Sequence, residues 1–489
     1  MSPRNGPVET FGGTNDLRTS FKNGDPDVDE LENLALQYAG RLLLRQEIPL
    51  DDITFKKLLS RKAFTPQPSM KKIYNRVKCL RCGNQTKHLF AEMPCQICRK
   101  NCLYCRKCIE MGRVMACQPL YAWTGIQPDW PTASDCLTWD GQLTTEQQHA
   151  SNQLLRTLHA KDDMLVWAVC GSGKTEMLFA CINEALSHGQ RVCIATPRAD
   201  VVRELLPRLE QAFSATVIQA LYGGSVTRMP TAPFIISTTH QLLRFQDAFD
   251  LMIIDEIDAF PFHKDPSLPY AAKRAVKRSH TSIYLTATPR KEQQRLIKEK
   301  KLPHVFVPKR FHGHPLPVPK CCMCFDLRRA LKQFLVPKKM IKWVKNRKNP
   351  DRQLLVFVPT IQMAEEVGNR LSQQLEINKM IMTGNNLQFV HAKDPHRKEL
   401  VKQFRDKKID ILITTTILER GVTFPSVDVA VVDGGHEVFD QAALVQIAGR
   451  AGRSPADPDG EVVFFHDGKT KAMSQAIKAI IMMNKKAGF

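Results

Sequence analysis

The sequence has no run of 18 uncharged apolar residues, which is what a membrane-spanning helix requires. Its first residues, MSPRNGPVETFGG, lack the apolar core of a secretory signal, so we expect a cytoplasmic protein. Aromatic residues make up only 7% of the chain, so stacking on aromatic rings is expected to play a limited part in binding. With 489 residues the chain is too long for one compact domain, and two to four domains are expected.

Acidic residues are scarce relative to basic ones, with 49 Asp and Glu against 70 Lys and Arg. The excess is localised: Arg61–Arg113 holds 13 basic and 2 acidic residues, and Ala271–Arg352 holds 23 basic and 4 acidic residues. Localised positive charge indicates a surface that faces a polyanion. Nucleic acid is the expected partner, with anionic lipid as the alternative.

The sequence predicts five segments along the chain. From Leu143, short continuous apolar runs such as MLVWAV and LMIID alternate with helical patterns, which is typical of parallel sheets buried on both faces. The Pro-rich stretch from His304 interrupts this alternation, so we expect two α/β domains. The expected segments are a tail and helical segment (1–75, with helices over LENLALQYAGRLLLRQ from Leu31 and from Asp51), a cysteine module (76–118), a linker (119–142), a nucleotide-binding domain (143–310) and a second α/β domain (311–489).

A glycine-rich loop lies between a predicted strand and a predicted helix, in the stretch WAVCGSGKTEM. This context predicts a phosphate-binding P-loop, although Ala168 stands where the first glycine of the usual pattern would be. Backbone N–H groups would cradle the phosphates of ATP, Lys174 would reach the β- and γ-phosphates, and the Thr175 hydroxyl would bind Mg²⁺. The loop residues expected to hold the nucleotide are Gly171, Ser172, Gly173, Lys174 and Thr175.

Two carboxylates follow the apolar run LMII directly. Asp255 is expected to hold Mg²⁺ through water, and Glu256 to orient the water that attacks the γ-phosphate. Further along, QIAGRAGRS places Arg450 and Arg453 three residues apart, on one face if the segment is helical. These guanidinium groups would neutralise charge that develops on the transferred phosphate. The expected ATP site therefore lies in a cleft between two domains.

The ordered series LTTEQ, GSGKT, TPR, STTH, DEID, TAT, ILITTTILERGV and QIAGRAGR resembles the motifs of superfamily 2 helicases, with two tandem RecA-like domains. The resemblance implies that Gln147 reads the adenine base. It also implies that Thr196, Arg198, Thr239 and His240 lie in segments that track a nucleic acid strand. The motif TAT at Thr286–Thr288 would couple hydrolysis to strand movement.

Seven of the fifteen cysteines lie between Cys79 and Cys108. Their CxxC spacing predicts zinc binding by thiolates. Seven cysteines exceed one four-ligand site and fall short of two, so Cys95, Cys98 and Cys102 are left open, and a second site would need Cys117 or His88. The cysteines at 170, 181 and 193 lie in apolar contexts and are expected in the core.

Together with the motor motifs, CLRCGN, YCRKCIEMGRV and LTWDGQLT resemble the ComFA family of competence ATPases, from about Arg76 to the C-terminus. The resemblance implies a zinc tetrad of Cys79, Cys82, Cys105 and Cys108. It also implies an ATPase that moves single-stranded DNA during uptake, at the inner face of the cell membrane. Its implied partners are a ComFC-like protein and a ComEC-type DNA channel, and a homo-oligomer is a further expectation. Two alternatives are a replication-restart helicase of the PriA kind and a DNA-binding zinc scaffold without motor activity.

Overall fold

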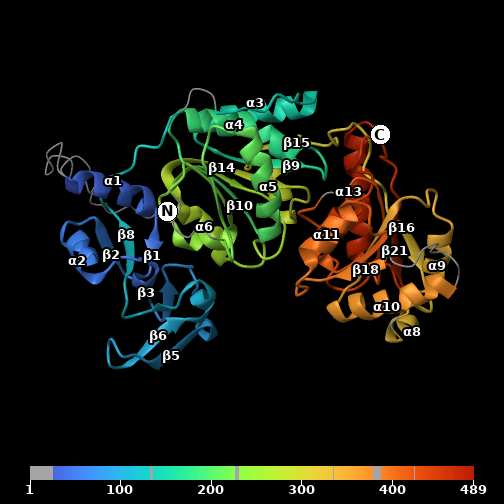
Figure 1. The fold of residues 1–489 in the computed structure, drawn as a ribbon, viewed down its shortest axis with the longest axis horizontal. Coiled ribbons are helices and arrows are strands. Elements are labelled where there is room, and N and C mark those ends of the chain that lie inside the picture. The colour runs from blue at the N-terminus through green and yellow to red at the C-terminus, as the bar shows by residue number, and fades with distance from the viewer. Residues whose placement is uncertain (1–25, 133–135, 226–230, 334, 378–386, 423) are drawn as a thin grey trace.

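The computed structural model describes residues 26–132, 136–225, 231–333, 335–377, 387–422 and 424–489. It has three parts along the chain: a small N-terminal part, a central domain and a C-terminal domain, which occupy the left, middle and right of Figure 1. The expected tail at residues 1–25 lies outside the described residues. None of the described helices is both long and apolar enough to cross a membrane.

The N-terminal part begins with helices that pack on a small antiparallel sheet of order β1-β8-β2. Rings of Tyr38, Phe64 and Trp123 form its core, with Phe64 5.1 Å from Tyr38 and 5.2 Å from Trp123 between ring centroids. The predicted helix from Leu31 ends at Tyr38, because Gly40 takes a left-handed conformation with φ +72°. The elements are α1 (Pro26–Tyr38), β1 (Leu42–Leu43), η2 (Arg45–Glu47), α2 (Asp52–Ser60), β2 (Phe64–Gln67) and β8 (Leu120–Trp123).

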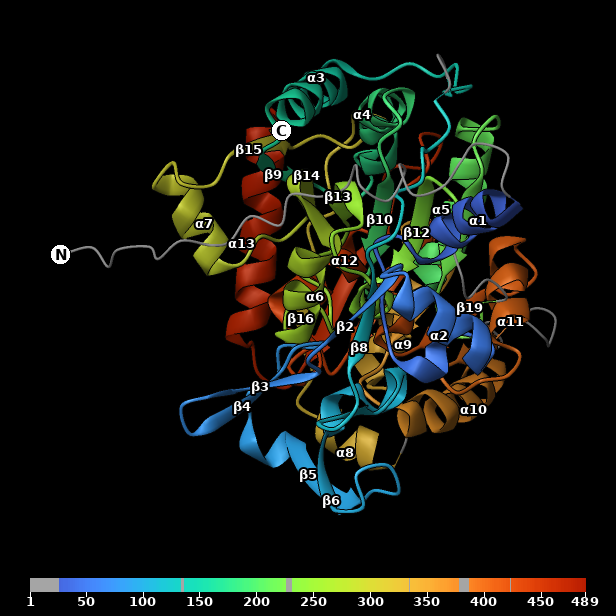
Figure 2. The same ribbon diagram turned by 90° about the vertical axis from the view of Figure 1, so that its left-hand side faces the viewer.

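The cysteine-rich segment forms two antiparallel units that extend from this sheet. One is the β3–β4 hairpin and the other is the three-stranded sheet of order β5-β6-β7. Figures 1 and 2 show these strands projecting below the central domain. The elements are β3 (Met70–Ile73), β4 (Arg76–Cys79), η3 (Lys87–Leu89), β5 (Phe90–Pro94), β6 (Asn101–Cys105), η4 (Arg106–Met111) and β7 (Val114–Met115).

The central domain is a seven-stranded parallel sheet of order β11-β12-β10-β13-β14-β9-β15. Its strands are apolar on both faces: Ile194 points into one core and Cys193 into the other. The strands are β9 (Asp163–Ala168), β10 (Val192–Thr196), β11 (Ile218–Leu221), β12 (Phe234–Thr238), β13 (Phe249–Ile254), β14 (Val276–Thr286) and β15 (His304–Val307). The helices are α3 (Thr145–Ala160), α4 (Lys174–Ser187), α5 (Ala199–Ala212), η5 (Thr239–Arg244), α6 (Ser267–Ala275) and α7 (Lys291–Lys298).

The C-terminal domain is a six-stranded parallel sheet of order β16-β21-β20-β17-β19-β18. Here too neighbouring residues serve opposite cores, as Leu354 and Leu355 do. The strands are β16 (Lys320–Met323), β17 (Gln353–Phe357), β18 (Leu387–Val390), β19 (Ile411–Thr414), β20 (Val427–Val432) and β21 (Val462–His466). The helices are α8 (Leu327–Lys332), α9 (Lys338–Lys345), α10 (Ile361–Ile377), α11 (Arg397–Arg405), η6 (Thr416–Leu418), α12 (Gln441–Ala448) and α13 (Lys471–Lys486).

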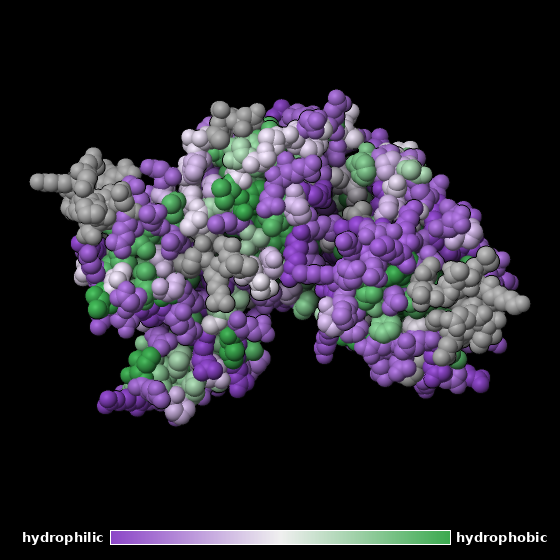
Figure 3. Space-filling model, in the orientation of Figure 1, coloured by the Kyte–Doolittle hydropathy of each residue, from purple (hydrophilic) through white to green (hydrophobic). Residues whose placement is uncertain are grey.

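These two parallel sheets are the tandem RecA-like domains that the motif series predicts. The carboxyl ends of parallel strands share one edge of a sheet, so loops that follow different strands meet there. The loops after β9 and β13 in the central domain therefore lie close together. Hydrophilic residues cover most of the visible face of the C-terminal domain (Figure 3).

Candidate nucleotide and zinc sites

The P-loop connects β9 to the N-terminus of α4, as the sequence predicts. Gly171 and Gly173 have φ values of +80° and +71°, a conformation that side chains other than glycine rarely adopt. A Cβ atom on Gly173 would lie 2.2 Å from Nε2 of Gln147, so that side chain would have to move away from the loop. Helix α4 begins directly after this turn, so its free N–H groups and positive dipole end form a site for a phosphate.

Gln147 lies in the first turn of α3 and contacts the P-loop. Its Nε2 donates to the Ser172 carbonyl oxygen at 2.8 Å, while its Oε1 accepts from the Thr144 N–H at 2.8 Å. The side chain is therefore fixed by the helix cap on one side and by the loop on the other. A role in reading adenine remains a proposal, and the structure places the residue beside the phosphate cradle.

Asp255 and Glu256 follow β13 and face the P-loop across the cavity described below. Burial raises the pKa of Asp255 to about 6, and this rise is partly offset by the Lys174 ammonium group. A magnesium ion would stabilise the carboxylate form in the same place. Glu256 adopts φ +55°, and its buried Oε2 has no hydrogen-bond partner among the residues that the structure describes. Nη1 of Arg420 lies 3.7 Å from this oxygen, which leaves it free to accept a hydrogen bond from a water molecule.

Arg450 and Arg453 follow α12, which ends at Ala448. The two arginines therefore lie in the turn after the helix, whereas their spacing would place them on one helical face. Nε of Arg450 donates to the Glu419 carbonyl oxygen at 3.1 Å. Its Nη1 has no hydrogen-bond partner within the described part of the chain. Burial lowers the pKa of Arg450 to about 9, so a negative phosphate would relieve an uncompensated buried charge.

A cavity of about 1470 Å³ separates the two RecA-like domains and brings most of these residues together. It exceeds the usual volume of a ligand pocket, so it has room for a nucleotide and for the closure of the cleft. Ser172 of the loop is fully buried and does not line the cavity. The lining residues that the sequence predicted are Gln147, Gly171, Gly173, Lys174, Thr175, Asp255, Glu256, Arg450 and Arg453.

A buried polar network that the sequence did not predict crosses the cleft beside this cavity. The Asp258 carboxylate accepts hydrogen bonds from the hydroxyls of Thr286 and Thr288, both at 2.7 Å, and from Nη2 of Arg420 at 2.6 Å. Burial alone would raise the pKa of Asp258, but Arg420 and the hydroxyl donors hold it well below its usual value. The network joins the loop after β13 and the TAT segment to the C-terminal domain.

The residues of the expected strand-tracking segments have different environments. Thr196 and Thr239 are fully buried, and their hydroxyl oxygens have no hydrogen-bond partner among the described residues. Arg198 pairs with Glu419 of the other domain at 2.8 Å. His240 is partly buried, and burial lowers its pKa. In this arrangement Arg198 connects the domains, and contact with DNA by these four residues remains a proposal.

Cys79, Cys82, Cys105 and Cys108 come together as a tetrad, with all four sulfur atoms within 4.8 Å of one another. The Sγ atoms of Cys79 and Cys108 are 3.8 Å apart, and those of Cys82 and Cys105 are 3.6 Å apart. Zinc bound tetrahedrally by sulfur at 2.3 Å places the sulfurs roughly 3.8 Å apart. The thiol geometry therefore fits a structural zinc ion, which would leave no open coordination position for a water molecule.

This tetrad packs directly on the central domain. Its four cysteines belong to the core that covers one face of the large sheet. Nη1 of Arg274, in α6, donates to the carbonyl oxygens of Leu80 and Arg81, between the first two cysteines. Lys107, between the last two, pairs with Asp265 at 2.8 Å. The cysteine module is thus attached to the loop and helix that follow β13.

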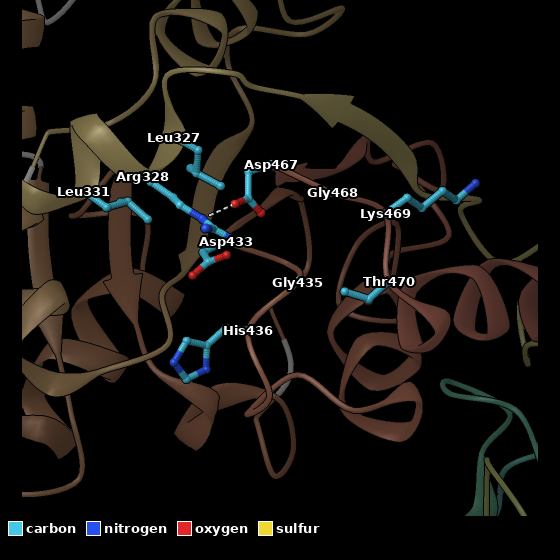
Figure 4. Close-up of a pocket in the computed structure, with 10 residues that line it drawn as sticks. All are labelled: Leu327, Arg328, Leu331, Asp433, Gly435, His436, Asp467, Gly468, Lys469 and Thr470. Atoms are coloured by element: carbon cyan, nitrogen blue, oxygen red, sulfur yellow. Dashed lines mark ion pairs between the residues drawn. The ribbon is translucent and has the colours of Figure 1, made fainter.

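A smaller cavity of about 440 Å³ opens at the carboxyl ends of β20 and β21 (Figure 4). Arg328 and Asp467 form an ion pair at its rim, and His436 and Asp433 face its interior. Burial raises the pKa of Asp433. None of the site residues predicted from the sequence lines this cavity, and its mixed charges do not select one ligand.

Three protein families match the chain in succession. The family described as "Competence protein ComFA N-terminal domain" matches residues 29–122. "Type III restriction enzyme, res subunit" matches residues 140–291, and "Helicase conserved C-terminal domain" matches residues 330–455. The last two matches correspond to most of the central domain and of the C-terminal domain.

Two curated relatives are similar over almost their whole length. The competence protein ComFA of Bacillus subtilis is 44% identical over 91% of this chain and 94% of the relative. That of Streptococcus pneumoniae is 39% identical over 93% of this chain and 99% of the relative. Among solved structures, the helicase Lhr of Mycobacterium smegmatis, bound to single-stranded DNA and AMP-PNP, aligns with a TM-score of 0.53. That match covers 70% of this chain and 50% of Lhr at 16% identity, and it bears on the fold alone.

Proposed function

Because the chain belongs to the ComFA family of competence proteins, we propose that it is an ATP-driven motor that translocates single-stranded DNA during uptake of transforming DNA. The family membership and the helicase fold establish a competence-related, helicase-like ATPase. The observation that carries the proposal is the cavity between the two RecA-like domains. It joins Lys174 and Glu256 from one domain to Arg450 from the other.

The residues suit hydrolysis of ATP with Mg²⁺. Lys174 and the N-terminus of α4 bind phosphate, Thr175 and Asp255 hold the metal, and Glu256 orients water. Arg450 and Arg453 come from the second domain, so the complete set depends on how the two domains meet. ATP binding would favour closure and hydrolysis would release it, which converts the reaction into a movement of the domains.

Single-stranded DNA is the proposed track because basic residues are concentrated on exposed elements. The lysines at 71 and 72 on β3, and those at 338, 342 and 345 on α9, are exposed. Contacts of this kind act on the phosphate backbone and are indifferent to base sequence. A ComFC-like protein, a ComEC-type channel at the inner face of the membrane and a second copy of the chain are the proposed partners.

A steady-state ATPase assay with and without single-stranded oligonucleotides tests the proposal. We expect ATPase activity that rises when DNA is added, and that Lys174→Ala abolishes in both conditions. ATP turnover that does not rise with DNA would contradict a motor that moves along DNA. A folded protein with no ATP turnover would favour the alternative of a DNA-binding zinc scaffold without motor activity. A preference for forked DNA with duplex unwinding would favour a replication-restart helicase.

A further inference from the structure

A second group of four cysteines lies in the β5–β7 sheet, apart from the first tetrad. Cys95, Cys98, Cys102 and Cys117 place their sulfur atoms within 4.8 Å of one another. Cys117 follows β7 and is the fourth member of the group, which Cys95, Cys98 and Cys102 alone would leave one ligand short. The eight cysteines thus divide into two complete groups of four.

The spacing of these sulfur atoms fits a metal better than a disulfide. The Sγ atoms of Cys95 and Cys117 are 3.6 Å apart, as are those of Cys82 and Cys105 in the first tetrad. Sulfurs around one zinc ion lie roughly 3.8 Å apart, given zinc–sulfur bonds of about 2.3 Å. A disulfide would require about 2.05 Å.

The backbone around Cys95 repeats the turn around Cys79. The N–H of Cys79 donates to the carbonyl oxygen five residues later at 3.0 Å, and that of Cys95 does the same at 3.1 Å. In each turn the residue after the second cysteine is left-handed: Gly83 has φ +73° and Arg99 has φ +53°. This conformation is uncommon for a residue other than glycine, so the two turns share a backbone shape that the arginine itself does not favour.

Strand β6 separates the two groups. Cys102 and Cys105 are three residues apart on this strand, and side chains at that spacing point to opposite faces. Cys102 accordingly belongs to the second group, and Cys105 to the tetrad against the central domain. The cysteines of the two groups therefore alternate along the chain, and a metal ion bound to one group cannot reach the sulfur atoms of the other.

The second group lies where apolar packing is minimal. The core of this region contains only three buried residues among those described: Cys95, Cys102 and Met115. The opposite face, with Cys105 and Val114, belongs to the core on the central domain, so the face that carries the second group has little apolar surface of its own to hold it in place. A bound metal ion would supply the missing stability, since zinc binding and folding are coupled in small cysteine modules.

We propose that Cys95, Cys98, Cys102 and Cys117 bind a second, structural zinc ion that holds the β5–β7 sheet together. Four thiolates fill its coordination shell, so the ion has no catalytic position. The inference stands independently of the motor, because none of these residues lines the nucleotide cavity.

Metal analysis of the full chain, purified under reducing conditions without added chelator, tests this site. We expect about two zinc ions per chain in the unmodified protein, because each four-thiolate group binds one. Cys95→Ser with Cys98→Ser should leave one ion, and so should the matched pair Cys79→Ser with Cys82→Ser. Cys321→Ser, outside both groups, should leave two.

Stepwise thiol modification of the unmodified protein gives a second measurement that does not depend on the folding of variants. Release of two zinc ions per chain, followed with a zinc-sensitive dye, supports the second site. A single zinc ion, retained in full by Cys95→Ser with Cys98→Ser, overturns it. A Cys95–Cys117 disulfide in intact mass analysis, together with one zinc ion per chain, overturns it as well.

Discussion

Arg420 of the C-terminal domain donates from Nη2 to the Asp258 carboxylate of the central domain at 2.6 Å, and both side chains are buried. The same guanidinium group lies 3.7 Å from Glu256 and 3.5 Å from Glu419. One guanidinium group thus lies near three carboxylates at the domain boundary, and Glu419 is paired with Arg198 as well. The pair of Arg420 and Asp258 joins the two domains beside the nucleotide cavity, so it links their relative position to the residues that surround the nucleotide.

Arg420→Ala is expected to weaken the closed arrangement. Removal of one partner leaves Asp258 buried without its counter-charge, which costs about 3–5 kcal/mol in comparable buried pairs. ATPase turnover should fall strongly, and energy transfer between fluorophores on the two domains should decrease with a bound ATP analogue. Arg295→Ala, on the exposed face of α7, removes the same charge and should change neither quantity. Unchanged closure in Arg420→Ala would contradict this role.

Glu256→Gln is expected to separate ATP binding from hydrolysis. The amide preserves the shape of the side chain but cannot accept a proton from water, so turnover should fall at least about 100-fold. Binding of a fluorescent ATP analogue should change little, because the P-loop remains intact. Glu292→Gln, an exposed residue of α7, serves as the control. Turnover near that of the unmodified protein would remove Glu256 from the mechanism.

His312 is expected to make the protein less stable as the pH falls below neutrality. Burial, with Arg310 nearby, lowers the pKa of His312 to about 4 from the ordinary value near 6.5. The neutral ring therefore stabilises the fold above pH 6.5, and this contribution is lost as the pH falls from about 6.5 to about 4.

Thermal unfolding between pH 7 and pH 4.5 measures the effect. The unmodified protein should lose more of its melting temperature over this interval than His312→Gln does. His149→Gln, at an exposed position, should behave like the unmodified protein. If the melting temperatures of the unmodified protein and of His312→Gln fell by the same amount with pH, His312 would be excluded as a cause of the loss of stability.

Arg274→Ala is expected to loosen the cysteine module from the central domain. The arginine donates to backbone carbonyl oxygens of Leu80 and Leu243, and hydrogen bonds from charged groups each contribute about 1.5–3 kcal/mol. Limited proteolysis should cut the module faster, whereas zinc content should remain. Arg278→Ala, exposed on the adjacent strand, is the matched control. Equal cleavage rates in both variants would contradict a role of Arg274 in holding the cysteine module on the central domain.

Binding of single-stranded DNA is expected to weaken steeply with salt. A footprint of about five to eight phosphates predicts a slope of roughly −3.5 to −6 for the logarithm of affinity against that of salt concentration. Lys71→Ala with Lys72→Ala should reduce the magnitude of this slope by about 1.4 if both lysines contact phosphates. Fluorescence anisotropy at several salt concentrations measures the slope. If the affinity for DNA did not change with salt concentration, the basic surfaces would have to bind a partner other than DNA.

Local patterns in the sequence predicted the parts of the site whose chemistry depends on neighbouring residues. The P-loop, the carboxylates after β13 and the spacing of Cys79 and Cys82 are all encoded within a few positions. The pairing of Arg420 with Asp258 was not predicted, because it joins residues 162 positions apart and depends on how two domains meet. The second cysteine group was left open for the same reason, since Cys117 joins it only through the pairing of β7 with β6.

The C-terminal part of the helix predicted from Leu31 is wrong because of tertiary pairing. The segment after Tyr38 has apolar residues at helical spacing, yet Leu42 and Leu43 form a strand. They pair with Ala122 and Tyr121 of β8, nearly 80 residues later. A left-handed Gly40 ends the helix, and burial in the small sheet outweighs the high helical propensity of the leucines.

Strand β14 connects the attachment of the cysteine module to the boundary between the two RecA-like domains. Its first residue, Val276, follows helix α6, in which Arg274 donates hydrogen bonds to the cysteine module. Its last residue, Thr286, donates a hydrogen bond to Asp258 at the domain boundary. Between Val276 and Thr281 the strand carries extra residues opposite Phe249 and Leu251 of β13, so its first half is bulged, and only Thr281–Thr286 is paired regularly. The strand therefore connects the helix that holds the cysteine module to the hydroxyl that contacts Asp258, and its regular half is fixed by β13 on one side and β9 on the other.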